Sequence, residues 1–412
     1  MRDIMTTISK VALALAGVAG LALAAESAHA QLVLNGAGSA AGRYYAVSVP
    51  VLLCAASPTP LLFVSSGNPP NLVEWQCTIN GVANSRIRYS ATNTVDAFIK
   101  QPPGAVGTAT YLNTASCPAG FFVTIFGRPV LKSVCPAATP TQILPVHWGG
   151  SDVSAGSLRQ TAFGLTQIPP LDSHLTTTAT VIIPFSIVVG GGVAGAVSLA
   201  HPRLSQVFKH AGGLTSWAFL RLAATPPTIV TCQRTPGDGT LAKVDATLLI
   251  PSLSGIYPLG GADNIPASSA SNMIACINNN RSSIGYIDSH DATATNFPTG
   301  AHQIQIDFFS PNAGALGTGV TRLKDVRCGD YPYWTYWNVV TRDAGVQGPP
   351  VNAVAGTNAA ITALQASMEA NNPLPDFWLS LGDTFVFKNQ DPGPLNWFTP
   401  SESGADYTVV CS

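Results

Sequence analysis

Four segments of this chain share one pattern. A run of apolar residues ends in a turn of small, glycine- and hydroxyl-bearing residues, and a stretch with helical spacing or a further polar turn follows. These turns lie at 36–39, 91–94, 149–152 and 234–240. Short apolar runs bounded by turn residues predict buried strands, and apolar residues three or four positions apart predict helices. The alternation of these elements predicts an α/β fold.

The same turns predict where a ligand would bind. In α/β sheets, ligands lie at the carboxyl ends of the strands. Helix N-termini at that edge offer unpaired N–H groups and a partial positive charge. The segment from His147 to Asp152 brings a hydroxyl, and the segment from Arg234 to Thr240 adds hydroxyls and a guanidinium that fits a tetrahedral oxyanion. Together, the four turns predict an anion site.

The apolar runs and helical spacings along the chain predict an approximate order of strands and helices. Strands are expected at 31–34, 85–90, 143–148, 179–189, 227–232, 284–287 and 334–340. Helices are expected at 42–50, 95–100, 204–210, 270–278 and 361–371.

The first thirty residues have the composition of a secretory signal peptide. Two basic residues, Arg2 and Lys10, precede an apolar run at 11–25, and Ala28-His29-Ala30 forms a small-residue cleavage site. Cleavage after Ala30 would leave Gln31 first, and the absence of a cysteine there argues against a lipid anchor. We therefore expect a periplasmic or secreted protein. The run 181–200 is interrupted by proline and glycines, so no membrane span is expected in the mature chain.

Eight cysteines lie after the cleavage site, at 54, 77, 117, 135, 232, 276, 328 and 411. An even number of cysteines in an exported chain indicates disulfides, and the absence of a C-x-x-C pair argues against zinc. The sequence does not fix the connectivity. We expect pairing between neighbours, which gives 54–77, 117–135, 232–276 and 328–411.

Composition and the absence of known motifs exclude several classes of function. The formal net charge is −1, and charged residues make up only 10% of the chain, so no nucleic-acid partner is expected. Removing 30 of the 412 residues leaves 382, enough for two lobes. No G-x-S-x-G elbow, Walker loop or H-E-x-x-H motif occurs, so we expect neither an enzyme nor a metal or other cofactor.

Six motifs in order carry a family resemblance: GAGS at 36–39, YSATNT at 89–94, VHWGGSD at 146–152, RTPGDGT at 234–240, IGY at 284–286 and YPYW at 331–334. Across nearly all of the mature chain this order resembles the periplasmic phosphate-binding proteins. These are the extracytoplasmic receptors of phosphate ABC transporters, and secreted DING-type proteins are their relatives. The resemblance implies a type II periplasmic-binding-protein fold, in which two lobes with mixed sheets flanked by helices are joined by a two-strand hinge. Lobe 1 would comprise 31–185 and 336–412, and lobe 2 would comprise 186–335, with crossing strands at 181–190 and 333–340.

The resemblance also implies a ligand set and a function. Asp152 would accept a hydrogen bond from a protonated phosphate oxygen, which disfavours sulfate, and Arg234 would hold both Asp152 and the anion. The candidate ligand-binding residues are Gly38, Ser39, Thr94, Ser151, Asp152, Arg234, Asp238, Gly239 and Thr240. The implied function is capture of inorganic phosphate, or a related oxyanion, between the lobes and delivery to an ABC permease.

Two positions depart from the family pattern. The first turn reads Gly36-Ala37-Gly38-Ser39-Ala40, so its hydroxyl lies one position earlier than in the family. Asp238 stands where the family has a serine, and a second carboxylate beside phosphate would repel it. Asp238 therefore points away from the ligand, pairs with Arg234, or marks a different ligand.

Other interpretations stay open. The chain could be a secreted structural or interaction protein that keeps the fold with a degenerate anion site, or a secreted phosphatase. Arg234 could form an ordinary ion pair, while Asp152 could cap an Asx turn and Asp238 could be a turn residue before a helix. His147 is expected to be a satisfied core histidine rather than a catalytic base. The aromatic segment 333–337 is expected to be a hinge strand rather than a sugar-stacking surface.

Overall fold

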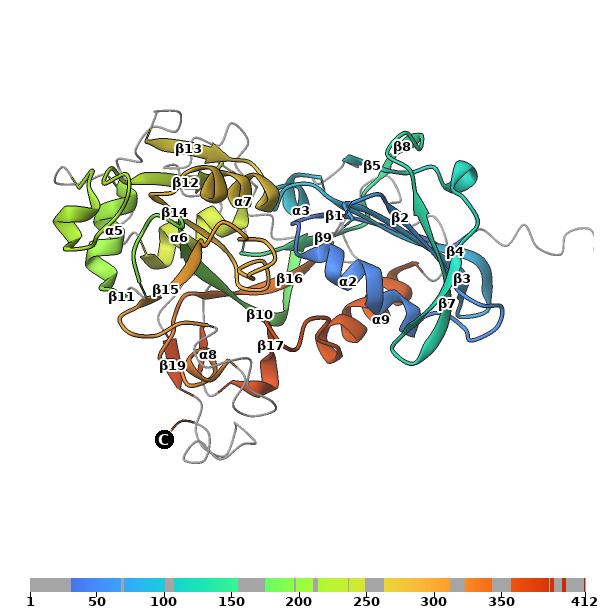
Figure 1. Ribbon diagram of the computed structural model, residues 1–412. Coiled ribbons are helices and arrows are strands. Elements are labelled where there is room, and N and C mark those ends of the chain that lie inside the picture. The colour runs from blue at the N-terminus through green and yellow to red at the C-terminus, as the bar shows by residue number, and fades with distance from the viewer. Residues whose placement is uncertain are drawn as a thin grey trace, which may run out of the picture.

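Two lobes joined by crossing strands make up the molecule in the computed structural model (Figure 1). The structure describes residues 31–67, 70–100, 107–154, 175–195, 198–209, 214–235, 237–248, 263–311, 323–342, 357–384, 386–388, 395–397 and 411. The predicted signal peptide at 1–30 lies outside the described residues. Among the described helices, none is long and apolar enough to cross a bilayer.

The first lobe is built on one half of a large mixed sheet, in which the strand order is β9-β1-β4-β3-β2-β7-β6. Its strands are β1 (Val33–Gly38), β2 (Leu61–Ser65), β3 (Leu72–Ile79), β4 (Val82–Ala91), β6 (Phe121–Ile125), β7 (Arg128–Cys135) and β9 (Trp148–Ser151). A separate pair consists of β5 (Thr108–Leu112) and β8 (Thr141–Pro145). The helices of this lobe are α2 (Gly42–Ser48), α3 (Asp96–Ile99) and α9 (Thr357–Ala370), and short 3-10 turns are η1 (Val49–Leu52) and η2 (Thr114–Ser116).

The second lobe carries the other half of the sheet, in the order β13-β12-β14-β10, with β15 also paired to β10. Its strands are β11 (Ser198–Leu199), β12 (Val230–Arg234), β13 (Asn264–Ala267), β14 (Ser283–Asp288) and β15 (His302–Ile306). Its helices are α5 (His201–Lys209), η5 (Trp217–Leu220), α6 (Gly239–Leu248), α7 (Ala270–Asn279) and α8 (Lys324–Arg327). Towards the C-terminus lie β17 (Leu379–Ser380), η7 (Leu381–Asp383), β18 (Val386–Lys388) and β19 (Leu395–Trp397).

Two strands pass between the lobes: β10 (Leu175–Val189) and β16 (Trp334–Arg342). They pair antiparallel with each other; β16 also pairs with β9, whereas β10 pairs with β14. Successive side chains of a strand point to opposite faces. Accordingly, Val181 and Trp337 lie in the hydrophobic core of the first lobe, while Ile182 and Trp334 lie in that of the second. The lobe boundaries expected from sequence stay a prediction.

The predicted α/β architecture is confirmed, although three segments were assigned wrongly. The run 143–148 is divided between β8 and β9, which belong to different sheets. Gly36–Gly38 and Gly149–Ser151 are strand rather than turn, because β9 inserts between β1 and β16. A Cβ on Gly149 would meet the Ala97 carbonyl oxygen at 2.6 Å, so glycine is required by close packing of a strand and not by a turn.

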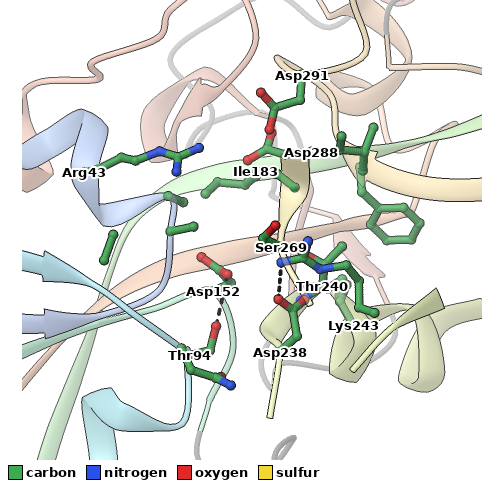
Figure 2. Close-up of a pocket in the computed structure, with 18 of the residues that line it drawn as sticks. Arg43, Thr94, Asp152, Ile183, Asp238, Thr240, Lys243, Ser269, Asp288 and Asp291 are labelled. Carbon is green, nitrogen blue, oxygen red and sulfur yellow. Dashed lines mark hydrogen bonds and ion pairs between the residues drawn. The ribbon is translucent and has the colours of Figure 1, made fainter. Parts of the chain in front are cut away.

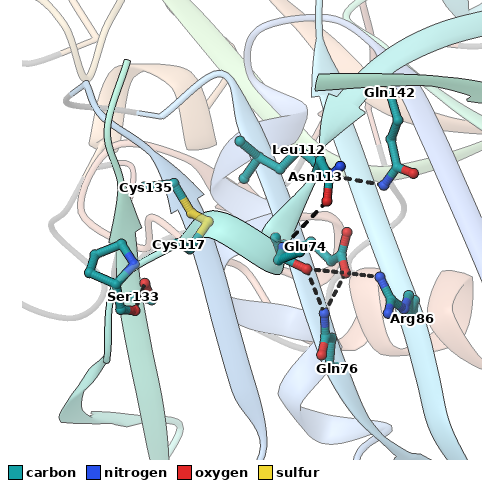
Figure 3. The surroundings of a disulfide bond; sticks show 12 residues. Glu74, Gln76, Arg86, Leu112, Asn113, Cys117, Ser133, Cys135 and Gln142 are labelled. Carbon is teal, nitrogen blue, oxygen red and sulfur yellow. Dashed lines mark hydrogen bonds and ion pairs between the residues drawn. A yellow bond between two sulfur atoms is a disulfide. The ribbon is translucent and has the colours of Figure 1, made fainter. Parts of the chain in front are cut away.

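All four expected disulfides are present: Cys54–Cys77, Cys117–Cys135, Cys232–Cys276 and Cys328–Cys411. Cys117–Cys135 joins the segment after η2 to the end of β7 (Figure 3). His147 is also as expected, since its Nδ1 accepts the backbone N–H of Asn35 at 3.1 Å. Burial lowers the pKa of His147 to about 4. The charge of Arg88 also lowers it, whereas a backbone hydrogen bond raises it. The low pKa keeps the ring neutral.

A buried ion network fixes the register of β3 and β4 in the first lobe (Figure 3). Glu74 is fully buried and binds Nε of Arg88 at 2.6 Å and Nη1 of Arg86 at 2.9 Å. Gln76 Nε2 donates to the same carboxylate at 2.7 Å. A buried carboxylate destabilises the fold if its hydrogen-bond donors are removed, and a buried guanidinium does the same if it loses the carboxylate.

We therefore predict that Glu74→Ala lowers the free energy of unfolding by about 3–5 kcal/mol, because it leaves the buried Arg88 guanidinium without a counter-charge. Urea denaturation measures this change. The matched control is Asp96→Ala, which breaks the partly exposed Asp96–Lys100 pair and should cost about 1 kcal/mol or less. Equal losses in the two variants would contradict the structural role of Glu74.

Candidate functional site

A cavity of about 190 Å³ lies between the two lobes, over the crossing strands. The first lobe contributes residues that precede or begin α2 and α3, together with Asp152 after β9. The second lobe contributes residues at the starts of α6 and α7 and at the end of β14. The polar and charged residues that line it are Arg43, Tyr44, Asn71, Thr92, Asn93, Thr94, Asp152, Arg234, Asp238, Thr240, Lys243, Ser268, Ser269, Ser271, Tyr286, Asp288, His290, Asp291 and Thr335.

Asp152 lines this cavity and lies between Arg43 and Thr94 in Figure 2. Its Oδ2 accepts a hydrogen bond from Thr94 Oγ1 at 3.2 Å, whereas its buried Oδ1 has no partner among the described residues. Burial raises the pKa of Asp152 to about 7, and the charges of Asp238 and Asp288 act in the same sense. The hydroxyls of Ser39 and Thr94 act in the opposite sense, because they donate to the ionised form.

Thr94 links the two lobes at this point. Its hydroxyl donates to Asp152 and accepts the backbone N–H of Gly239, the first residue of α6, at 3.0 Å. A Cβ on Gly239 would meet Asp152 Cβ at 2.7 Å and Thr94 Oγ1 at 2.8 Å. Only glycine allows the start of α6 to approach the first lobe this closely.

Asp238 does not point away from the cavity: it is paired with Arg234. Asp238 Oδ2 accepts from Nη2 of Arg234, and Oδ1 accepts from the backbone N–H groups of Thr240 at 2.9 Å and Leu241 at 3.3 Å. One carboxylate therefore forms the contacts that a bound anion would make with a guanidinium and a helix N-terminus. Arg234 retains a buried Nε without a partner among the described residues.

Arg43 is a second guanidinium in the cavity, and sequence reasoning missed it. It lies in the first turn of α2 and is 8% exposed. Its Nη1 donates to Asn71 Oδ1 at 3.3 Å, and its buried Nε has no partner among the described residues. The only available signal was its position four residues after Ser39, which is also where a surface arginine of an amphipathic helix would stand.

The far end of the cavity holds a histidine between two carboxylates. His290 Nδ1 lies 3.1 Å from Asp288 Oδ1, and His290 Nε2 lies 3.1 Å from Asp291 Oδ1. Burial opposes the charged ring, but the two carboxylates outweigh it and raise the pKa of His290 to about 11. The Tyr44 hydroxyl of the first lobe is hydrogen-bonded to Nε2, so this cluster also bridges the lobes.

The structure brings most of the predicted site residues to one place. Thr94, Asp152, Arg234, Asp238 and Thr240 line the cavity, and Gly239 donates to Thr94. The other three predicted residues are not among those that line the cavity.

Ser39, Ser151 and Gly38 have other partners. Ser39 Oγ accepts from Trp337 Nε1 at 2.9 Å, so its hydroxyl is engaged with the core of the first lobe. The Ser151 hydroxyl is bonded to the Val153 carbonyl. Gly38 lies against Gly150, because β1 and β9 are adjacent strands.

Comparison with known proteins yields structural likenesses only. No family model matches the chain, and no curated protein matches it. Among solved structures, the chain is similar to a DING protein at 15% identity and a TM-score of 0.44, covering 84% of this chain and 91% of that one. A phosphate-binding protein from Stenotrophomonas maltophilia matches at 16% identity and a TM-score of 0.39, with 82% and 93% covered. PstS from Borrelia burgdorferi matches at 11% identity and a TM-score of 0.39, with 85% and 99% covered.

The raised pKa of Asp152 has a measurable consequence for stability. Its value of about 7 in the folded chain exceeds the ordinary 3.8, so the folded state holds the proton more tightly than the unfolded state. The contribution of Asp152 to stability therefore falls as the pH rises from about 4 to about 7 and levels off above that range. Asp152→Asn does not titrate, and we predict that its stability relative to the native chain rises over this range.

Urea midpoints of both proteins at one-unit steps from pH 4 to pH 8 measure the difference. A difference that stays constant over these steps would contradict a raised pKa for Asp152.

Proposed function

We propose that this protein is an extracytoplasmic receptor that binds a small oxyanion between its lobes, with monohydrogen phosphate as the leading candidate. The observation that carries the proposal is Oδ1 of Asp152, which has no hydrogen-bond partner among the described residues, in a residue that lines the cavity together with Arg43 and Arg234. An anion that carries a proton satisfies both kinds of group, because its oxygens accept from the guanidiniums and its hydroxyl donates to Asp152.

The start of α7 supports the same ligand class. Residues 268–271 line the cavity, and Ser269 caps the helix by accepting the N–H of Asn272 at 3.1 Å. The first N–H groups of a ten-residue helix carry a partial positive charge that favours an anion. Binding would thus draw on both lobes, because Asp152 and Arg43 belong to one wall and α7 to the other.

The proposed selectivity follows from hydrogen-bond chemistry. An ionised Asp152 accepts a hydrogen bond but cannot donate one, so a fully deprotonated anion would place an acceptor against an acceptor. Phosphate keeps a proton at neutral pH, whereas sulfate does not. Ionised Asp152 therefore favours phosphate.

Transport is the proposed biological setting. The four disulfides suit an oxidising compartment outside the cytoplasm, in keeping with the predicted signal peptide. Closure of the lobes on the anion would create the surface that an ABC permease recognises, and the crossing strands are the natural place for such bending.

The proposal predicts phosphate binding at pH 8, where Asp152 is ionised, with sulfate weaker by at least about 10-fold. In Asp152→Asn the side-chain amide can donate as well as accept, so the preference should shrink by about 10-fold or more. Titration calorimetry with each anion measures both effects. Absence of heat and of any thermal shift at millimolar phosphate would overturn the proposal.

The Arg234–Asp238 pair favours a second candidate. If Asp238 permanently replaces the ligand, the protein is a secreted structural or interaction protein that keeps the fold and has an occupied anion site. Under this alternative the native chain binds neither phosphate nor sulfate. Asp238→Ser would acquire phosphate binding, because serine still caps α6 while freeing Arg234. Binding by the native chain would reject this alternative.

A further inference from the structure

The positively charged side chains of the cavity differ in the partners that lie near them. Arg234 is paired with Asp238, and His290 is paired with Asp288 and Asp291. Lys243 Nζ lies 5.7 Å from the centre of the Trp334 ring. Arg43 differs from Arg234 and His290, because no carboxylate lies within ion-pair distance of its guanidinium among the described residues.

The surroundings of Arg43 hold it in place without neutralising it. Asn71 Oδ1 accepts from Nη1 at 3.3 Å, and the guanidinium carbon lies 5.3 Å from the centre of the Tyr44 ring. Both contacts leave the positive charge intact, and the buried Nε has no acceptor in the part of the chain that the structure describes. Figure 2 shows the side chain reaching from α2 into the cavity that Asp152 also lines.

A buried guanidinium with an unused donor is costly unless an acceptor arrives. The acceptor could be a ligand or a carboxylate of the opposite wall. The carboxylates of that wall are those of Asp238, Asp288 and Asp291. Asp238 is paired with Arg234, and the other two are paired with His290. A ligand oxygen is the partner that remains.

We propose that Arg43, rather than Arg234, provides the principal charged contact to the bound oxyanion, because Asp238 has taken the place of the ligand on Arg234. The inference rests on the proposed function and specifies how that site is built. Arg43 holds the anion from the first lobe, and the Arg234–Asp238 pair acts as a neutral wall. Asp238 is in turn a specificity-determining residue, since it removes one positive charge from the site.

Three variants test this arrangement by calorimetry with phosphate at pH 8. Arg43→Met keeps the length of the stem but removes the charge, and affinity should fall by about 10- to 100-fold. Arg234→Met/Asp238→Ser removes the neutral pair as a unit, and affinity should stay within about 3-fold of the native value. Arg43→Met/Asp238→Ser frees Arg234, and most of the lost affinity should return.

Asn71→Ala provides a milder test that leaves the charge in place. It removes only the acceptor that orients Nη1, so the loss of affinity should be smaller than in Arg43→Met. Unfolding midpoints of all variants show whether the fold is retained.

The proposal is overturned if Arg43→Met binds phosphate as the native chain does, or if the paired variant at 234 and 238 abolishes binding. A native chain that binds no phosphate, together with an Asp238→Ser variant that does, is a different failure. It would reject the proposed function and would also show that Arg43 alone is insufficient. Absence of binding in every protein, including Asp238→Ser, would reject both proposals.

Discussion

The antiparallel pairing of β10 with β16 is the constraint on which the rest of the structure depends. The ladder runs from Leu175 opposite Arg342 to Pro184 opposite Trp334, and it joins two half-sheets that have separate hydrophobic cores. A shift of one residue would turn every inward side chain to the wrong face. The pairing also places Ile183 and Thr335 beneath the cavity, so the register that builds both cores fixes the floor of the site.

The cavity itself is organised by carboxylates. Asp152 is protonated for part of the neutral range, Asp238 is bound to a guanidinium and a helix start, and the pair at 288 and 291 encloses a histidine. Each carboxylate raises the cost of ionising the others because they share one poorly solvated space. A site of this kind favours an anion that brings its own proton, and the guanidinium of Arg43 has no carboxylate within ion-pair distance among the described residues.

Much of the fold was predictable from local pattern. Strand β10 was predicted from a long apolar run, helices α7 and α9 were predicted from helical spacing, and the cysteines paired with their neighbours. The errors fell where long-range pairing overrides local signals. Gly149 and Gly150 resemble a turn in sequence, but the close approach of neighbouring backbone and side chains makes them strand. Strands β2, β3, β6 and β7 were not predicted. Their place in the sheet depends on the parallel pairing of β2 with β7, which joins residues as far apart in the sequence as Leu61 and Leu131.

The sequence by itself determined the α/β class, because apolar periodicity and strand-end turns act over short distances. It left the disulfide connectivity open, and it predicted that Thr94, Asp152 and Arg234 line one cavity. Only the tertiary structure decided the roles of Ser39, Asp238 and Arg43. The hydroxyl of Ser39 is held by a tryptophan nearly three hundred residues away, and the partners of the two charged side chains depend on how the lobes meet. The electrostatic role of a side chain depends on its burial and on its distance from other charges in the folded structure. The spacing of residues along the chain does not give these two quantities.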